Sequence, residues 1–365
     1  MYVIKGRALR LSASAQFKIT LLGGMWLSGI ALADSASANT IHVCSTCAHT
    51  SIQAAVNDAA SGDSIDIAAG RYAENVSSAG KALTFVGESA SSTLVYATGR
   101  GPVFTLGSAV AGDPPLLITI RGLTISHGNH SGGTGVGGGV QVRAGSYLHI
   151  ENSTIVGNIA TSGAGVGIDS PGAPASTITS CLIDGNFAGT GRVGGNGGGV
   201  EVRPGSTVSI QQSYITRNGG TSGGGVFGWD GSAIAVAGTT ISGNSVNPVS
   251  RPTGPQGGGG GGIEAHGTIG IDSSYILNNV ANGEDGGGGL LLLPDSSGVT
   301  TLSNTIVAQN GGTGIQVLGG TLTLQNSYVI QNSGGIFGNV VLSLSGSTIK
   351  DNVGHDICLP DNCGP

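Results

Sequence analysis

Residues 197–218 read GGGVEVRPGSTVSIQQSYITRN, and the pattern of the last six residues recurs along the chain. The pattern is Ser, Thr or Cys, any residue, Ile or Val, two further residues and then Asn. A constant motif at uneven intervals of this size predicts a solenoid whose coil has about 20 residues, with loops inserted at one corner. Its Asn residues are Asn158, Asn186, Asn218, Asn244, Asn279, Asn310, Asn332 and Asn352, at intervals of 28, 32, 26, 35, 31, 22 and 20 residues.

An alternating apolar segment such as TVSI or TLTL precedes the motif, and a Gly cluster and a second short apolar segment follow it. This period of two, with no helical periodicity between the segments, predicts β-strands. We expect the motif Asn to lie at a corner, where it tolerates left-handed backbone, and to form a ladder of stacked amides. The Gly triplet before Val200 predicts another corner, where a Cβ would clash.

The composition favours an ordered chain over a disordered one and argues against a nucleic-acid partner. Of the 365 residues 70 are Gly, 9% are charged, 4% are aromatic, and the formal net charge is −6. Mean hydropathy is positive, which favours an ordered, repetitive fold over disorder. The chain has no basic patch, so we expect no nucleic-acid partner, and we expect a monomer.

The N-terminal residues have the order of a secretory signal peptide. Basic residues come first, the apolar run ITLLGGMWLSGIALA follows, and small residues then offer cleavage after Ala33 or Ala38. We therefore assign residues 1–38 to a signal peptide and residues 39–365 to the mature domain. No later segment predicts a membrane-spanning helix. We expect a secreted protein of the extracellular space or cell surface, with the periplasm as the alternative.

The five Cys fit an oxidising compartment. Cys181 occupies the Ser/Thr position of the repeated motif, which predicts a buried and inert thiol. The others stand at the two ends of the mature chain. If those ends lie tens of ångströms apart, only Cys44–Cys47 and Cys358–Cys363 can form disulfides.

Residues 50–67, TSIQAAVNDAASGDSIDI, differ from the repeats. Thr50 or Ser51 can N-cap a short helix, and a strand is expected at residues 64–67. One face of that helix is apolar, formed by Ile52, Ala55, Val56 and Ala59. A solenoid needs such a cap over its first coil, so we assign residues 39–75 to an N-terminal cap and residues 354–365 to a C-terminal cap.

The stretch SIQAAVNDAASGDSIDIAAGRYAENV at residues 51–76 resembles the opening of pectin-lyase-like right-handed parallel β-helix proteins, especially pectin methylesterases. The S-x-I-x-x-N and GGG-[VI] repeats resemble those of polymorphic outer-membrane proteins and other secreted bacterial β-helix proteins. Together the two resemblances cover roughly residues 40–355. They imply an all-β, single-stranded right-handed parallel β-helix over residues 40–357, with about ten to twelve coils at ~4.8 Å per coil. They also suggest uronate β-elimination or epimerisation.

Alternation along the strand after each Gly cluster predicts two columns of outward side chains. The first contains Gln141, Gly167, Glu201, Phe227, Glu264, Leu291 and Gln316. The second contains Arg143, Asp169, Arg203, Trp229, His266, Leu293 and Leu318. The insertions at residues 188–199 and 245–262 leave the same edge, and we expect them to form the walls of a groove.

We interpret these columns as a surface that binds a polysaccharide or cell-surface glycan. Aromatic rings stack on sugar faces, and Arg side chains pair with uronate carboxylates. A charge ladder that only keeps an exposed sheet soluble is the non-functional alternative. The expected substrate-binding residues are Arg143, Asp169, Glu201, Arg203, Phe227, Trp229, Glu264 and His266.

The absence of a recognisable catalytic motif favours an adhesin-like or polysaccharide-binding protein. The alternative is a polysaccharide lyase or epimerase acting on uronic-acid polymers, in which a base removes the C5 proton and positive charge steadies the carboxylate. The catalytic candidates are then Arg203, His266 and Glu201. Asp169 and Glu201 are the candidates for holding Ca²⁺ in such a lyase.

Overall fold

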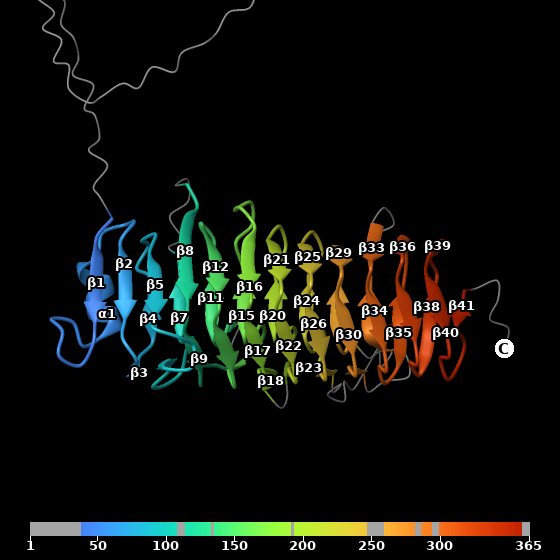
Figure 1. The fold of residues 1–365 in the computed structure, drawn as a ribbon, viewed down its shortest axis with the longest axis horizontal. Coiled ribbons are helices and arrows are strands. Elements are labelled where there is room, and N and C mark those ends of the chain that lie inside the picture. The colour runs from blue at the N-terminus through green and yellow to red at the C-terminus, as the bar shows by residue number, and fades with distance from the viewer. Residues whose placement is uncertain are drawn as a thin grey trace, which may run out of the picture. The chain divides into compact units, whose positions relative to one another are not determined.

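The computed structural model describes residues 38–107, 114–132, 135–190, 193–246, 259–281, 286–293 and 299–359. The predicted signal peptide apart from its last residue, residues 247–258 of the second insertion, and Cys363 lie outside these ranges. The chain divides into two units, Met1–Ser37 and Ala38–Pro365, and every described residue belongs to the second. In this unit the strands follow one another along one axis from β1 to β41 (Figure 1).

The coils of the second unit contribute strands to four sheets, called here sheets I to IV in the order in which the chain visits them. Over the described residues these sheets have 12, 11, 7 and 11 strands, and neighbouring strands come from successive coils. Sheet I contains β1 (Thr40–Val43), β2 (Ser64–Ile67), β5 (Thr84–Gly87), β8 (Leu116–Arg121), β12 (Ser146–Glu151), β16 (Ser176–Thr179), β21 (Thr207–Gln211), β25 (Ala233–Ala237), β29 (Thr268–Asp272), β33 (Val299–Ser303), β36 (Thr321–Gln325) and β39 (Val341–Ser345).

Sheet II carries the Ile or Val of the repeated motif, and sheet III is formed by very short strands after the motif Asn. Sheet II contains β3 (Gly70–Ala73), β6 (Thr93–Tyr96), β9 (Thr124–Ser126), β13 (Thr154–Val156), β17 (Leu182–Asp184), β22 (Tyr214–Thr216), β26 (Thr240–Ser242), β30 (Tyr275–Leu277), β34 (Ile306–Ala308), β37 (Tyr328–Ile330) and β40 (Thr348–Lys350). Sheet III contains β10 (Asn129–His130), β14 (Ile159–Ala160), β18 (Phe187–Thr190), β23 (Gly219–Gly220), β27 (Ser245–Val246) and β31 (Val280–Ala281), with β19 (Val193–Gly194) paired antiparallel to β18.

Sheet IV follows the Gly clusters. It contains β4 (Val76–Ser77), β7 (Phe104–Leu106), β11 (Val140–Val142), β15 (Val166–Ile168), β20 (Val200–Val202), β24 (Val226–Gly228), β28 (Ile263–Ala265), β32 (Gly287–Leu292), β35 (Thr313–Val317), β38 (Gly334–Gly338) and β41 (Ile357–Cys358). The pairing of successive coils is parallel throughout sheet IV, as between β20 and β24. This architecture confirms the predicted parallel β-solenoid, and the strands of sheet I agree with the expected number of coils.

The core is a stack of inward side chains, one layer for each coil. In the coil that ends at Asn218, the side chains of Val200, Val202, Val208, Ile210 and Ile215 are fully buried. They alternate with outward residues, as a strand requires. Because each layer rests on the next, the apolar surface of a single coil is covered only by its neighbours.

The motif Asn residues form the predicted ladder. Asn218 Nδ2 donates to Asn244 Oδ1 at 3.0 Å and to the carbonyl of Ile183 at 2.9 Å, while Asn218 Oδ1 accepts from the backbone N and the Nδ2 of Asn186. The side-chain bond from each Asn to the next links all eight, from Asn158 to Asn352. These buried amides are therefore satisfied by their own copies in adjacent coils.

One detail of that prediction is wrong. The left-handed backbone lies at the residue before the motif Asn, as at Gly157 (φ 64°) and Arg217 (φ 53°), and not at the Asn itself. The left-handed residue turns the chain, and the Asn follows it directly. The side-chain amide of this Asn points inward and bonds to the neighbouring coils.

The Ser, Thr or Cys of the motif forms a second line of hydrogen bonds that the sequence analysis did not predict. The backbone N of Cys181 donates to Ser213 Oγ at 3.1 Å, and that of Ser213 donates to Thr239 Oγ1 at 3.3 Å. Cys181 is buried as expected, and burial raises the pKa of its thiol to about 11. Its Sγ donates to the carbonyl of Thr179.

The Gly triplets are corners, as predicted. A Cβ on Gly199 would lie 2.6 Å from the carbonyl oxygen of Gly225 in the next coil, which no side chain tolerates. Gly197, two residues earlier, has a φ of +63°, which only glycine adopts freely. The small residues thus let the backbones of successive coils approach closely at this corner.

The helix predicted near the N-terminal end of the solenoid is present. Helix α1 (Ile52–Asp58) begins after Ser51, whose side chain accepts from the backbone N of Ala54, and its apolar face is buried. The carboxylate of Glu74 accepts hydrogen bonds from the backbone N of Ile52 and of Gln53. The Cys44–Cys47 disulfide is present, whereas the predicted Cys358–Cys363 pair lies partly outside the described residues. Within the described ranges, no helix is long and apolar enough to cross a membrane.

Candidate functional site

The two predicted columns have the expected register on sheet IV. Gln141, Gly167, Glu201, Phe227 and Glu264 are direct partners on successive strands. The second column continues this register just past the strand ends. The backbone N of Trp229 donates to Val202 O, and that of His266 donates to Gly228 O. Arg203, Trp229 and His266 therefore lie on consecutive coils, just after β20, β24 and β28. Strands β20 and β24 are labelled near the middle of the solenoid in Figure 1.

The solvent exposure expected for the first column is wrong. Glu201, Phe227 and Glu264 are 0%, 2% and 6% exposed, and Leu291 and Gln316 are buried as well. These side chains do point away from the apolar core, but another part of the chain covers them. They cannot form an open sugar-binding surface.

The covering segments are the Gly-rich turns between sheets III and IV. A Cβ on Gly163 would lie 3.0 Å from Glu201 Cβ, and a Cβ on Gly223 would lie 2.7 Å from Phe227 Cβ. The turns thus fold over the outward face of sheet IV, where they meet the strand that follows them or the strand of the next coil. Since the residues at these places are glycines, the turns lie directly on the side chains they bury.

The second column remains accessible and is built around Trp229. The Trp229 ring is half-buried and meets the buried ring of Phe227 edge to face, with centroids 5.2 Å apart. Phe227 also packs against His266 at 5.3 Å. Arg203 lies over the Trp229 ring, its Cζ 5.6 Å from the ring centroid, which is a cation–π contact. Phe227 is therefore the support beneath a small aromatic and cationic surface.

A buried carboxylate orients this surface. Trp229 Nε1 donates to Glu201 Oε1 at 2.7 Å, and Arg203 Nε lies 3.6 Å from the same oxygen. Burial raises the pKa of Glu201 to about 7, and the charge of Asp169 acts in the same direction. The hydrogen bond from Trp229 and the charge of Arg203 oppose that shift. The protonation state of Glu201 therefore changes within the physiological pH range.

His266 is held between two carboxylates. Its Nε2 lies 2.9 Å from Glu264 Oε1 and its Nδ1 lies 3.7 Å from Asp230 Oδ1. The hydrogen bond to Glu264 raises the pKa of His266, burial opposes the rise, and the charges of Glu264 and Asp230 add to it. Sequence reasoning missed Asp230. Its position directly after Trp229, in the turn that ends the strand, is the signal that places it beside the second column.

Arg143 and Asp169 begin the second column and are exposed. Arg143 Nε donates to Gln141 Oε1 at 3.1 Å. Asp169 and Glu201 are neighbours, as the prediction of a Ca²⁺ site requires. However, Glu201 lies under a turn, and within the described ranges no three His, Cys, Asp or Glu side chains are arranged to hold a metal ion.

The predicted groove walls are only partly described. β18 and β19 form a short antiparallel hairpin in the first insertion, while residues 191–192 and 247–258 lie outside the described ranges. The second column itself continues toward the C-terminus through Leu293 and Leu318, whose backbone N atoms donate to Ala265 O and Leu292 O.

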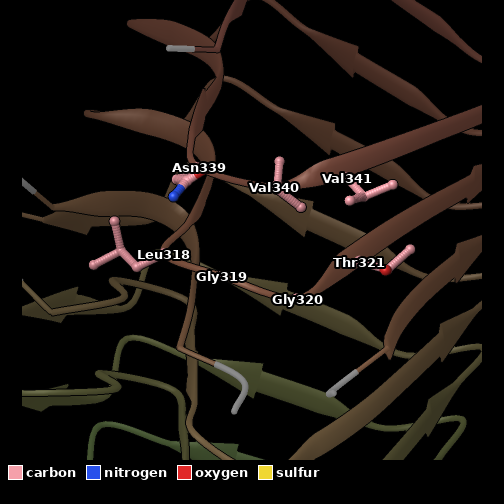
Figure 2. Close-up of a pocket in the computed structure, with 7 residues that line it drawn as sticks. All are labelled: Leu318, Gly319, Gly320, Thr321, Asn339, Val340 and Val341. Carbon is pink, nitrogen blue, oxygen red and sulfur yellow. The ribbon is translucent and has the colours of Figure 1, made fainter. Parts of the chain in front are cut away.

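A pocket opens where this column ends. Figure 2 shows Leu318 and Asn339 on one side of it and Thr321 and Val341 on the other. Its remaining lining residues are Gly319, Gly320 and Val340, so none of the described residues that line it has a titratable side chain. The pocket extends the apolar end of the column but adds no chemical group to the site around Trp229.

Sequence reasoning also missed a set of exposed aromatic residues on another face. Tyr214, Tyr275 and Tyr328 are about half exposed, at 58%, 48% and 45%, and lie on sheet II. The signal was available, since each is the second residue of the repeated motif and alternation points it outward. They lie on a different sheet from Trp229 and are not part of the candidate site.

Comparison with known proteins agrees with the geometry of the coils. A family model described as "Right handed beta helix region" matches residues 92–246 and 192–353. This match confirms the predicted right-handed parallel β-helix. No curated protein matches the sequence.

Several solved structures are similar over most of their length. The pectin methylesterase from carrot is 12% identical, with 88% of each chain covered and a TM-score of 0.33. Pectin methylesterase PemA from Erwinia chrysanthemi is 11% identical, with 89% of this chain and 93% of that chain covered and a TM-score of 0.40. An alginate lyase from Paenibacillus sp. str. FPU-7 is 13% identical, with 88% and 98% covered and a TM-score of 0.41. At these identities no residue role is transferred to this chain.

Proposed function

The chain belongs to the family of proteins with a right-handed β-helix region, and from that premise we propose that it binds a polysaccharide or cell-surface glycan, in the manner of an adhesin. The binding edge is the second column of sheet IV. Its central residues are Arg203, Trp229 and His266, with Arg143 and Asp169 continuing it toward the N-terminus.

The observation that carries this proposal is the fixed orientation of Trp229. Its N–H donates to the buried Glu201, its ring packs edge to face with that of Phe227, and part of its surface remains accessible. An aromatic ring that is already held in place loses little conformational entropy when a ligand stacks on it. Sugar rings present apolar C–H faces that suit such a surface, and the neighbouring Arg203 and His266 supply hydrogen-bond donors.

The second candidate function is a lyase or epimerase acting on uronic-acid polymers. It needs an accessible base, and His266, with a side chain 27% exposed, is the candidate that the geometry leaves. Glu201 is enclosed, and Arg203 lies against Glu201 and Trp229. The carboxylates beside His266 raise its pKa, which favours the protonated imidazole over the basic one. This observation supports binding as the first proposal.

We also propose that the protein acts outside the cytoplasm. The described Cys44–Cys47 disulfide supports this, because such bonds persist in oxidising compartments. The order of residues 1–38 supports export as well. Detection of the mature chain in the culture medium or at the cell surface tests this proposal, and retention of the unprocessed chain in the cytoplasm contradicts it.

Binding is tested with Trp229→Ala on a glycan array and by calorimetric titration. Loss of a stacked sugar contact is expected to weaken binding by about 1–2 kcal/mol, or roughly 5- to 30-fold. Tyr214→Ala is the matched control, since it removes an exposed aromatic residue from another sheet and is expected to leave binding unchanged. Equal affinity of wild type and Trp229→Ala would contradict the proposed site.

The lyase alternative is tested separately. The protein is incubated with pectate and alginate in the presence of Ca²⁺, and the absorbance of unsaturated products is followed. Sustained formation of such products by wild type, lost in His266→Ala, would replace the binding proposal with the catalytic one. A search for epimerised residues by NMR covers the reaction that forms no double bond.

A further inference from the structure

The contacts of Glu201 are unusual for a buried acid. The residue is 0% exposed, yet among the described residues only one of its carboxylate oxygens has a hydrogen-bond partner. Oε1 accepts from Trp229 Nε1, whereas Oε2 is buried without a partner among the described residues. An unpartnered buried carboxylate oxygen is costly, and the cost is greatest when the group is ionised.

Arg203 also has an unsatisfied hydrogen-bonding group. Its Nε lies 3.6 Å from Glu201 Oε1, too far for a hydrogen bond, and has no other partner in the described part of the chain. The side chain is 26% exposed and lies over the ring of Trp229. The guanidinium is thus close enough to Glu201 for its charge to be neutralised, but it is not held in a bidentate ion pair.

The charges around Glu201 come from two coils. Arg203 follows it on its own coil, and Asp169 lies at the end of β15 on the preceding one. On the following coil the facing side chains are Phe227 and Trp229, which carry no charge. The next coil carries the pair formed by Glu264 and His266.

We propose that Glu201 controls the specificity of this site because its carboxylate competes with the carboxylate of a bound glycan for the charge of Arg203. The ionised carboxylate neutralises the guanidinium, and the protonated acid leaves its positive charge available to the carboxylate of a glycan bound across Trp229. Glu201 is therefore a positioning and specificity-determining residue, and the preferred ligand is an anionic glycan at mildly acidic pH. The inference rests on the proposed glycan-binding function.

Protonation leaves the Trp229 contact intact, because the carbonyl oxygen of a carboxylic acid still accepts the indole N–H. The ring stays oriented in both states and only the charge available from Arg203 changes. Affinity for a neutral glycan is therefore expected to be independent of the Glu201 proton. Affinity for an anionic glycan is expected to rise as pH falls through about 7, where burial places the pKa of Glu201.

The test uses a matched pair of probes, an oligogalacturonate and the same oligomer with its carboxylates methyl-esterified. Calorimetric titrations at pH 5.5 and pH 8 are run on the wild type and on Glu201→Gln and His266→Gln. The wild type is expected to bind the acidic oligomer about 5- to 10-fold more tightly at pH 5.5, and the ester equally at both values. Glu201→Gln is expected to bind the acidic oligomer at pH 8 as tightly as the wild type does at pH 5.5.

His266→Gln separates the two titrating groups, since a protonated His266 also attracts an anion. Most of the pH dependence is expected to survive in His266→Gln, and Glu201→Gln is expected to keep only the smaller part that comes from His266. The reverse result would assign the effect to His266 and overturn the inference. Failure of the wild type to bind either oligomer at any pH would refute the proposed function itself.

A second measurement needs no ligand. With Trp26→Phe in every variant, Trp229 is the only Trp in the chain, and its fluorescence reports on the contact with Glu201. We expect a transition near pH 7 in this background that is absent in Glu201→Gln and retained in His266→Gln. A signal that is flat across this range, or a transition that persists in Glu201→Gln, would overturn the inference.

Discussion

Trp229 Nε1 donates a hydrogen bond of 2.7 Å to Glu201 Oε1, so a half-buried ring on one coil is fixed by a buried carboxylate on the coil before it. The Asn ladder is built in the same way, by side chains that bond to the neighbouring coil. The candidate site and the core thus depend on the same stacking. A substitution in one coil is therefore expected to alter the hydrogen bonds of side chains in the adjacent coil.

The ladder is expected to be a main source of stability. Asn218→Ala removes the bonds to Ile183 and Asn244 and leaves the buried amide of Asn186 without its acceptor. Buried groups left without partners cost about 1–3 kcal/mol each, so a loss of roughly 3 kcal/mol or more is expected in urea unfolding. Asn352→Ala, at the half-exposed end of the ladder, is the control and is expected to cost less because water reaches it. Equal losses would contradict the account of the ladder.

Adding a single methyl group at the Gly corner is expected to destabilise the protein. In Gly199→Ala the new Cβ would lie 2.6 Å from the backbone oxygen of Gly225, and such overpacking typically costs about 1–3 kcal/mol. Gly270→Ala is the matched control, because its Cβ would meet nothing within 4 Å and its backbone is not left-handed. We expect the melting temperature to fall in the first variant and to stay within error in the second. A stable Gly199→Ala protein would show that the coils can separate at this corner.

The buried acid is expected to make stability depend on pH. Burial raises the pKa of Glu201 from its ordinary value of 4.5 to about 7, so the protonated form is the favoured one in the folded chain. The stabilising contribution of this proton is fully present below about pH 4.5 and is lost as the pH rises to about 7, which corresponds to about 3 kcal/mol.

Glu201→Gln, which remains neutral, is expected to lack this loss. The free energy of unfolding of the wild type should therefore fall relative to that of the variant between pH 4.5 and pH 7, and then run parallel to it. Denaturant unfolding at a series of pH values measures the difference, in which the titration of His266 cancels. Parallel curves over the whole range would show that folding does not raise the pKa of Glu201.

Cys181 is expected to be chemically silent in the folded protein. Its thiol is buried and its pKa is raised to about 11, so little thiolate is present or accessible at pH 8. Alkylation followed by peptide mass mapping should find Cys181 unmodified in the native protein and fully modified in denaturant. Rapid modification of the native thiol would contradict the inward orientation of the repeated motif.

The repeated motif was sufficient to predict the coil, and local physics explains why. The period-two alternation of Val200 and Val202 places them inward whatever the path of the neighbouring turns. The register of Glu201 with Phe227 and Glu264 follows from stacking equal motifs. The order of Arg203, Trp229 and His266 along one edge follows in the same way. The helix after Ser51 could be predicted from its N-cap residue and its apolar face.

The sequence by itself therefore determined which side chains share a column and which enter the core, because both depend on spacing within a coil and on the repetition of that coil. Only the tertiary structure decided what covers the outward face. Glu201 and Phe227 point away from the core as alternation requires, but the turns at Gly163 and Gly223 fold over them. The path of a Gly-rich turn is not encoded by alternation, since glycine permits many backbone conformations and the contacts with adjacent coils select one. That choice converts an exposed carboxylate into a buried one and gives Trp229 its partner.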